Sequence, residues 1–170
     1  EKISDFPELI HKCYTNDKLE NLLGFKEHLM KIKEKHYRDF CFLGLISILR
    51  KVSHAHTGWP YVLPKKSKPN NIDVLTSFRN QLEMMTEDLS SVITNDNKKI
   101  QCDIENFDCR NLTKKVDDNK IDFAFTSPPY LNNFDYADRT RLELYFATPY
   151  NFNKTTKTIK TWANLRTEIR

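Results

Sequence analysis

Apolar residues in the first half of the chain recur at helical spacing. Residues 6–36 carry an irregular helical pattern that two short helices joined near Gly24 would satisfy. Residues 37–52 are apolar on most sides, which predicts a helix buried between other elements, with Arg50 and Lys51 suited to its carboxyl end. Farther on, apolar positions alternate at spacings of three and four: Leu75, Phe78, Leu82, Met85, Leu89 and Val92. They predict one helix packed on a sheet, capped by Asn70 or Asn71.

Glycine and proline interrupt this pattern between the second and third helical regions. Gly58 and Pro60 break residues 53–62. Trp59 and Tyr61 precede several lysines, a combination that suits nucleic acid, although residues 65–71 are equally consistent with a solvated linker. His54 and His56 have no further ligands nearby in the sequence, so we expect polar loop residues and no metal site.

The second half of the chain has the pattern of strands. Residues 99–107 alternate loosely and end at Asp108, and residues 121–125 form an apolar run that leads into Ser127, Pro128, Pro129 and Tyr130. A buried parallel strand that stops at two prolines presents rigid backbone at the edge of a sheet where open α/β folds bind ligands. The alternatives are a surface turn or a proline-rich recognition segment, and the preceding apolar run favours the strand.

The tetrapeptide Ser127-Pro128-Pro129-Tyr130 resembles the catalytic motif of DNA amino-methyltransferases, which methylate the exocyclic amine of cytosine (N4) or adenine (N6) with S-adenosylmethionine. A leading Ser is the spelling usual in the N4-cytosine branch. The resemblance is strong over residues 98–146 and fainter over residues 40–97. It implies an α/β fold, a partial Rossmann-like methyltransferase fold with a mainly parallel sheet flanked by helices.

Within that resemblance, residues 1–97 form a mainly helical region, residues 98–146 the catalytic strand and turn, and residues 147–170 a loop and a basic helix. The Ser127 side chain and a backbone carbonyl fixed by Pro128 and Pro129 would accept the two amine hydrogens of the target base, while Tyr130 would stack on the base. Such acceptors push the amine nitrogen toward the geometry needed to attack a sulfonium methyl group.

The resemblance also implies further contacts. Asp108 is the candidate for the adenine of the cofactor, with Asp103 as the competing assignment and a plain turn-capping aspartate as the alternative for both. Thr126 and Ser127 adjoin the cofactor. The candidate substrate or DNA contacts are Asn132, Asp135, Tyr136, Arg139 and Arg141. The two arginines suit phosphates or helix-capping ion pairs, and Glu143 is close enough in sequence to pair with Arg139.

Glycine is scarce where this family needs it. The chain has three glycines, Gly24, Gly44 and Gly58, and no two of them could form the glycine-rich turn that cradles S-adenosylmethionine. We therefore expect a partial methyltransferase. The remaining part, from the same parent chain or a partner subunit, would supply the cofactor loop.

Composition adds modest constraints. A formal net charge of +4 is compatible with DNA binding but does not demand it. The four cysteines are scattered and favour reduced thiols, and no secretory signal or transmembrane span is visible, so we expect a cytoplasmic protein with no membrane contact.

The sequence thus predicts methyl transfer from S-adenosylmethionine to a DNA base amine, with cytosine N4 favoured, in a bacterial restriction-modification system. The alternatives are a noncatalytic DNA-binding or scaffold subunit and an N6-adenine methyltransferase, and an RNA or protein amine is a further substrate class.

Overall fold

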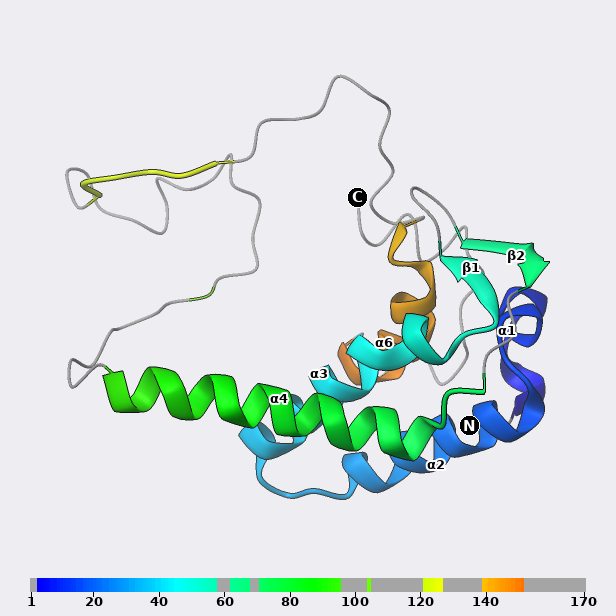
Figure 1. Cartoon of the computed structure of the whole chain (residues 1–170), viewed down its shortest axis with the longest axis horizontal. Helices are drawn as coiled ribbons and strands as arrows, with labels where there is room; N and C mark the ends of the chain where they lie inside the picture. Colours follow the sequence, from blue (N-terminus) through cyan, green and yellow to red (C-terminus); the bar gives the residue numbers. More distant parts are fainter. Residues whose placement is uncertain are drawn as a thin grey trace.

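A computed structural model of the chain describes residues 3–57, 62–67, 71–95, 104, 121–126 and 139–151. A short 3-10 helix, η1 (Ile3–Asp5), precedes the helices α1 (Glu8–Cys13), α2 (Asn16–Met30) and α3 (Lys35–Val52). The strands β1 (Ala55–Thr57) and β2 (Val62–Ser67) follow, and then the helices α4 (Val74–Asn95) and α6 (Arg141–Asn151). Figure 1 shows these helices gathered side by side, with the strand pair at one end beside α1.

The central element is α3, which packs against α2, α4 and α6. This confirms the helix expected over residues 37–52. Its side chains Leu45, Ile48, Leu49 and Val52 are almost fully buried, whereas Leu43 is 58% exposed, so α3 is covered on several sides but not all round. Burial of this apolar surface is the main source of stability that holds the three neighbouring helices to α3.

The hydrophobic core joins the two ends of the described chain. The ring of Phe146 on α6 lies 5.3 Å from that of Phe6, centroid to centroid, and 6.0 Å from that of Tyr14 in an edge-on arrangement. Leu142 and Tyr145 of α6 are also buried. Aromatic pairs at these separations add to the stabilisation that burial provides. Helix α6 is therefore fixed to the amino-terminal helices, although its sequence lies far from them.

The division of the amino-terminal helices differs from the expected one. Gly24 lies inside the continuous helix α2, and the break between helices falls at Tyr14 and Thr15. The helix continues through Gly24 because Leu19, Leu22, Leu23 and Leu29 bury one face of it, which outweighs the unfavourable helix propensity of a single glycine.

Helix α4 confirms the helix predicted from spacings of three and four, but Leu75, Leu89 and Val92 of its apolar stripe are 49–63% exposed, and its surroundings differ from expectation. It packs on α2 and α3 rather than on a sheet: the rings of Phe78 and Phe25 are 5.2 Å apart, and Leu82 lies against Gly44. Its N-cap is Asp73, whose Oδ2 accepts the backbone N–H of Thr76 at 2.7 Å, and not Asn70 or Asn71. Figure 1 shows α4 running alongside α3 and past its end.

The expected α/β fold with a mainly parallel sheet is wrong for the residues that the structure describes. They are predominantly helical, and their sheet is one antiparallel pair in which His56 lies opposite Leu63 and Thr57 opposite Val62. Strand β2 also includes Lys65 and Lys66, so the start of the segment 65–71, for which the sequence is consistent with a linker or a nucleic-acid contact, is a strand.

Residues 121–126 are not in a strand. Ile121, Phe123 and Phe125 are 60%, 80% and 92% exposed, so the buried catalytic strand predicted there is contradicted as well. The physical reason is that a parallel strand needs hydrogen-bonded neighbours and covered faces. The described parts of the chain offer this segment neither.

Candidate functional site

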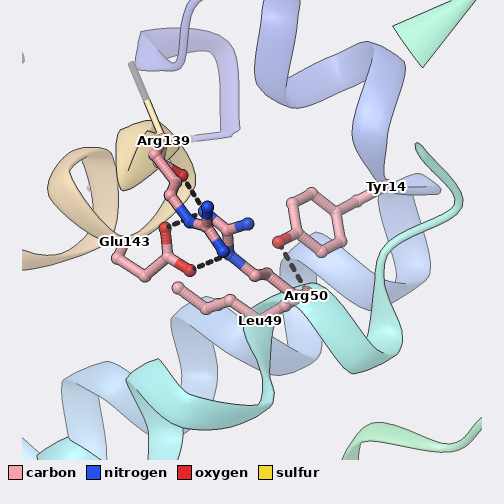
Figure 2. Close-up of polar contacts among 5 residues, drawn as sticks. All are labelled: Tyr14, Leu49, Arg50, Arg139 and Glu143. Atoms are coloured by element: carbon pink, nitrogen blue, oxygen red, sulfur yellow. Dashed lines mark hydrogen bonds and ion pairs between the residues drawn. The ribbon is translucent and has the colours of Figure 1, made fainter. Parts of the chain in front are cut away.

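The best-defined polar site lies where the carboxyl end of α3 meets the start of α6. Arg50, in the last turn of α3, donates from Nε to Oε1 of Glu143 and from Nη2 to Oε2 at 3.2 Å. The same Nη2 donates to the backbone carbonyl of Arg139. Figure 2 shows the guanidinium between the carboxylate and that carbonyl. The side chains of Arg50 and Glu143 are 30% and 21% exposed, so this bidentate ion pair is shielded from much of the solvent.

The end of α3 that carries Arg50 is itself held in place. The buried hydroxyl of Tyr14 donates to the carbonyl of Leu49 at 2.9 Å, and Lys18 Nζ donates to that of Val52 at 2.9 Å. These donors satisfy carbonyls that the last turn of a helix leaves without partners inside the helix. Beyond the helix, Ser53 Oγ and the backbone N–H of His54 both donate to the carbonyl of Cys13, at 3.1 and 2.8 Å.

Burial and hydrogen bonding both shift the pKa values of groups at this junction. It raises the pKa of Tyr14 well above its usual value and that of the Cys13 thiol to about 11, although Ser53 and Arg141 act in the opposite direction on Cys13. Hydrogen bonding to Glu143 raises the pKa of Arg50. At neutral pH the phenol and the thiol are therefore neutral and Arg50 is cationic. The junction can hold a helix end in place, and neither Tyr14 nor Cys13 is activated as a base or nucleophile.

Two of the predicted DNA contacts lie at this junction. Arg141 is the first residue of α6 and Arg139 lies two positions before it, and both are partly buried. The predicted alternative for Arg139 was an ion pair with Glu143, but the structure pairs Glu143 with Arg50. Sequence reasoning placed Arg50 at a helix end and gave no sign of this partner, because the two residues are 93 positions apart.

Of the other predicted site residues, the structure describes Thr126. Thr126 is exposed and lies outside any helix or strand. The remaining candidates lie outside the described residues and stay predictions: Asp103, Asp108, Ser127, Pro128, Pro129, Tyr130, Asn132, Asp135 and Tyr136.

A second feature is an open groove of about 700 Å³ along α4. Phe25, Phe78 and Leu82 line it together with Glu83 and Glu87. It offers apolar contact with these carboxylates and the guanidinium of Arg79 beside it, and this lining by itself specifies no reaction.

Two kinds of feature were sought in the described ranges, a cluster of metal ligands and a membrane-spanning helix. Among those residues, no group of three or more His, Cys, Asp and Glu side chains could hold a metal ion. Within the same ranges, no helix combines the length and apolarity needed to cross a bilayer.

Comparison with known proteins relates the chain to methyltransferases. It is similar to the type II beta methyltransferase M.BslI of Bacillus sp. (strain NEB-606), with 28% identity over 110 residues. The similarity covers 54% of this chain and 12% of that protein, so the chain spans about an eighth of the length of this relative. No family model matches the chain, and no solved structure matches it.

Proposed function

We propose that this chain is part of a DNA methyltransferase that transfers a methyl group from S-adenosylmethionine to an exocyclic base amine, with cytosine N4 as the favoured target. The observation that carries the proposal is the motif Ser127-Pro128-Pro129-Tyr130 in a chain that is similar to a type II beta methyltransferase. That relative's class also supports a role in a restriction-modification system.

The chemistry of an amine acceptor explains the residue types in the motif. The lone pair of an exocyclic amine is delocalised into the base, so the nitrogen attacks the sulfonium methyl group only when acceptors draw its hydrogens out of the ring plane. Ser127 and the carbonyl held by Pro128 and Pro129 supply such acceptors. The methylated ammonium then loses its proton readily. The base must leave the duplex, which costs a few kcal/mol, and stacking on Tyr130 partly offsets that cost.

DNA contacts are proposed for residues that follow the motif in the sequence. Asn132, Asp135 and Tyr136 lie between the motif and α6 in the sequence and would face the base. Arg139 and Arg141 follow at the start of α6, where a cationic side chain can contact a phosphate while the rest of it packs against the helix.

The cofactor site requires more than this chain. Asp108, Thr126 and Ser127 are the proposed contacts to S-adenosylmethionine, but three separated glycines provide no turn for its methionine end. The chain spans only about an eighth of its relative. We propose that the remaining part of the methyltransferase, in the same parent chain or in a partner subunit, supplies that turn.

The direct test is methyl transfer from radiolabelled S-adenosylmethionine to DNA by the full-length parent protein, followed by identification of the modified nucleoside. Ser127→Ala should lower kcat/KM by about 5- to 150-fold, and Tyr130→Ala by a similar factor, which corresponds to about 1–3 kcal/mol for a lost hydrogen bond or stacked base. Ser47→Ala is the matched control, because Ser47 is exposed on α3 and its hydroxyl donates to the carbonyl of Leu43 in the same helix. Full activity of both motif variants would refute the assignment. N6-methyladenine as the product would show that the target base is adenine and not cytosine.

The missing glycine-rich turn favours a second candidate, a noncatalytic DNA-binding or scaffold subunit. Calorimetry with S-adenosylmethionine separates the two functions. Binding by the completed protein but not by this chain alone supports the enzyme. DNA binding without cofactor binding in either form supports the scaffold.

A further inference from the structure

We propose that the connection between α2 and α3 is a second DNA-contact surface, which binds phosphates of the duplex away from the target base. This basic turn comprises residues 31–38, all of them within the described part of the chain, and it exposes Lys31, Lys33 and Lys35. The choice of DNA as the polyanion rests on the proposed function. Figure 1 shows the turn at the end of the helices opposite the strand pair.

Positive charge is concentrated at this turn. Residues 31–39 hold four cations and two carboxylates, so this short segment carries a net charge of +2, half of the +4 of the whole chain. The stability of α3 does not explain this charge. The amino terminus of a helix favours acidic side chains, yet the first turn of α3 has none and begins with Lys35.

The backbone holds the basic turn in a fixed shape. The N–H groups of Lys31 and Ile32 donate to carbonyls in the last turn of α2, each at 3.1 Å. Ile32 is partly buried against the core, and its carbonyl accepts a hydrogen bond from Nη1 of Arg38 at 3.3 Å. Lys31 and Lys33, on either side of Ile32, are exposed. Because this backbone is already held before binding, little conformational entropy is lost when a ligand contacts the two lysines.

The side chains of the turn suit phosphates. A lysine ammonium carries three donors and no acceptor, and it binds a phosphate as a point charge. Lys35 pairs with Asp39, but its side chain is 77% exposed, so this ion pair is weak in water and a phosphate can replace the carboxylate. Tyr37 is 60% exposed and adds a hydroxyl, another group that contacts DNA phosphates. Such contacts supply affinity and carry no base sequence information.

The basic turn lies far from the proposed contacts at Arg139 and Arg141. Arg139 is bonded to Arg50 in the last turn of α3, whereas Lys35 begins that helix. A helix of 18 residues is about 27 Å long, which is less than one turn of duplex DNA. A single duplex can therefore contact both ends of α3, and changes in the turn leave the proposed catalytic residues untouched.

The test measures binding of a fluorescent DNA duplex by the full-length parent protein at a series of salt concentrations. Lys31→Gln/Lys33→Gln removes two phosphate contacts. The slope of log K against log salt concentration should become less steep by about 2, and the Kd should rise about 10- to 60-fold near 0.1 M salt. The kcat at saturating DNA should stay within about twofold of the wild-type value, because the lysines act in binding alone.

Two control variants separate a local contact from net charge and from folding. Lys12→Gln/Arg79→Gln removes the same charge from exposed positions on α1 and α4, and it should change the slope by less than about 0.5, since charges beyond a Debye length are screened. Lys31→Arg/Lys33→Arg keeps the charge and should bind DNA within about threefold of the wild type. Thermal denaturation checks that all three variants are folded.

The outcomes distinguish this surface from the proposed function. Methyl transfer to DNA with an unchanged salt slope in Lys31→Gln/Lys33→Gln would overturn the surface and leave the proposed function standing. Equal losses in the glutamine variant and in Lys12→Gln/Arg79→Gln would also overturn it. DNA binding that depends on the two lysines, in a protein that transfers no methyl group, would support the surface and refute the enzyme. Tighter binding to single-stranded RNA than to the duplex would overturn DNA as the partner.

Discussion

The hydroxyl of Tyr14 donates to the carbonyl of Leu49 at 2.9 Å, in a buried bond that links α1 to the carboxyl end of α3 across 35 positions of sequence. Its ring also packs edge-on against Phe146 of α6. One side chain thus contacts both helices that Arg50 and Glu143 join. Figure 2 shows Tyr14 beside Arg50, with its hydroxyl directed at the carbonyl of Leu49.

Tyr14→Phe tests the hydroxyl alone, because the ring and its packing are kept. We expect the free energy of unfolding to fall by about 1–2 kcal/mol, since the Leu49 carbonyl loses a buried donor. Urea denaturation measures the change. Tyr37→Phe is the matched control, because Tyr37 is 60% exposed, and it should change stability by less than about 0.5 kcal/mol. Equal effects of the two variants would contradict the importance of the buried bond.

Stability should depend on alkaline pH through Cys13. Burial raises the pKa of its thiol from 9.0 to about 11, so the unfolded chain releases the proton at lower pH than the folded one. The stability that the protonated Cys13 thiol contributes to the fold is therefore fully present below about pH 9 and is lost as the pH rises to about 11.

Denaturation under reducing conditions at a series of pH values checks this dependence. Between about pH 9 and pH 11, the free energy of unfolding of the wild type should fall by about 1–2 kcal/mol more than that of Cys13→Ser. Parallel pH profiles for the two proteins would show that the thiol does not titrate differently in the folded state.

The two helical glycines should respond oppositely to substitution. A Cβ on Gly44 would lie 2.8 Å from Cδ2 of Leu82, whereas a Cβ on Gly24 would meet nothing within 4 Å. Gly44→Leu should push α4 from α3 and cost about 1–3 kcal/mol. Gly24→Ala should stabilise α2 by about 0.5–1 kcal/mol, because alanine is the better helix former. Thermal denaturation of both variants provides the comparison, and destabilisation by Gly24→Ala would contradict the open space around that position.

Substitutions of two phenylalanines test whether residues 121–126 are exposed, in contrast to the buried strand that the sequence predicts there. Phe123 is 80% exposed, so Phe123→Ser should change the stability of this chain by less than about 0.5 kcal/mol. Phe146 is fully buried, and Phe146→Ala should cost about 3–5 kcal/mol. Chemical denaturation of the chain measures both. A loss of more than about 2 kcal/mol for Phe123→Ser would mean that residues 121–126 are buried after all.

The sequence by itself determined the features that depend on local spacing. The continuous apolar character of residues 37–52 and the three-and-four spacing along α4 identify helices, because each pattern places apolar side chains on helix faces that can be buried. The motif at Ser127 to Tyr130 likewise suggested a chemistry through its residue types and their order. These inferences need no knowledge of which segments are neighbours.

Only the tertiary structure decided which segments meet. Arg50 and Glu143 are 93 positions apart, and no periodicity relates them. The apolar run at residues 121–125 has the composition of a buried strand, yet its large side chains are exposed, because burial depends on neighbouring strands and covering helices that the described chain does not bring to it. A helix forms its hydrogen bonds within one segment, whereas a strand and an ion pair between helices need a partner from elsewhere in the chain.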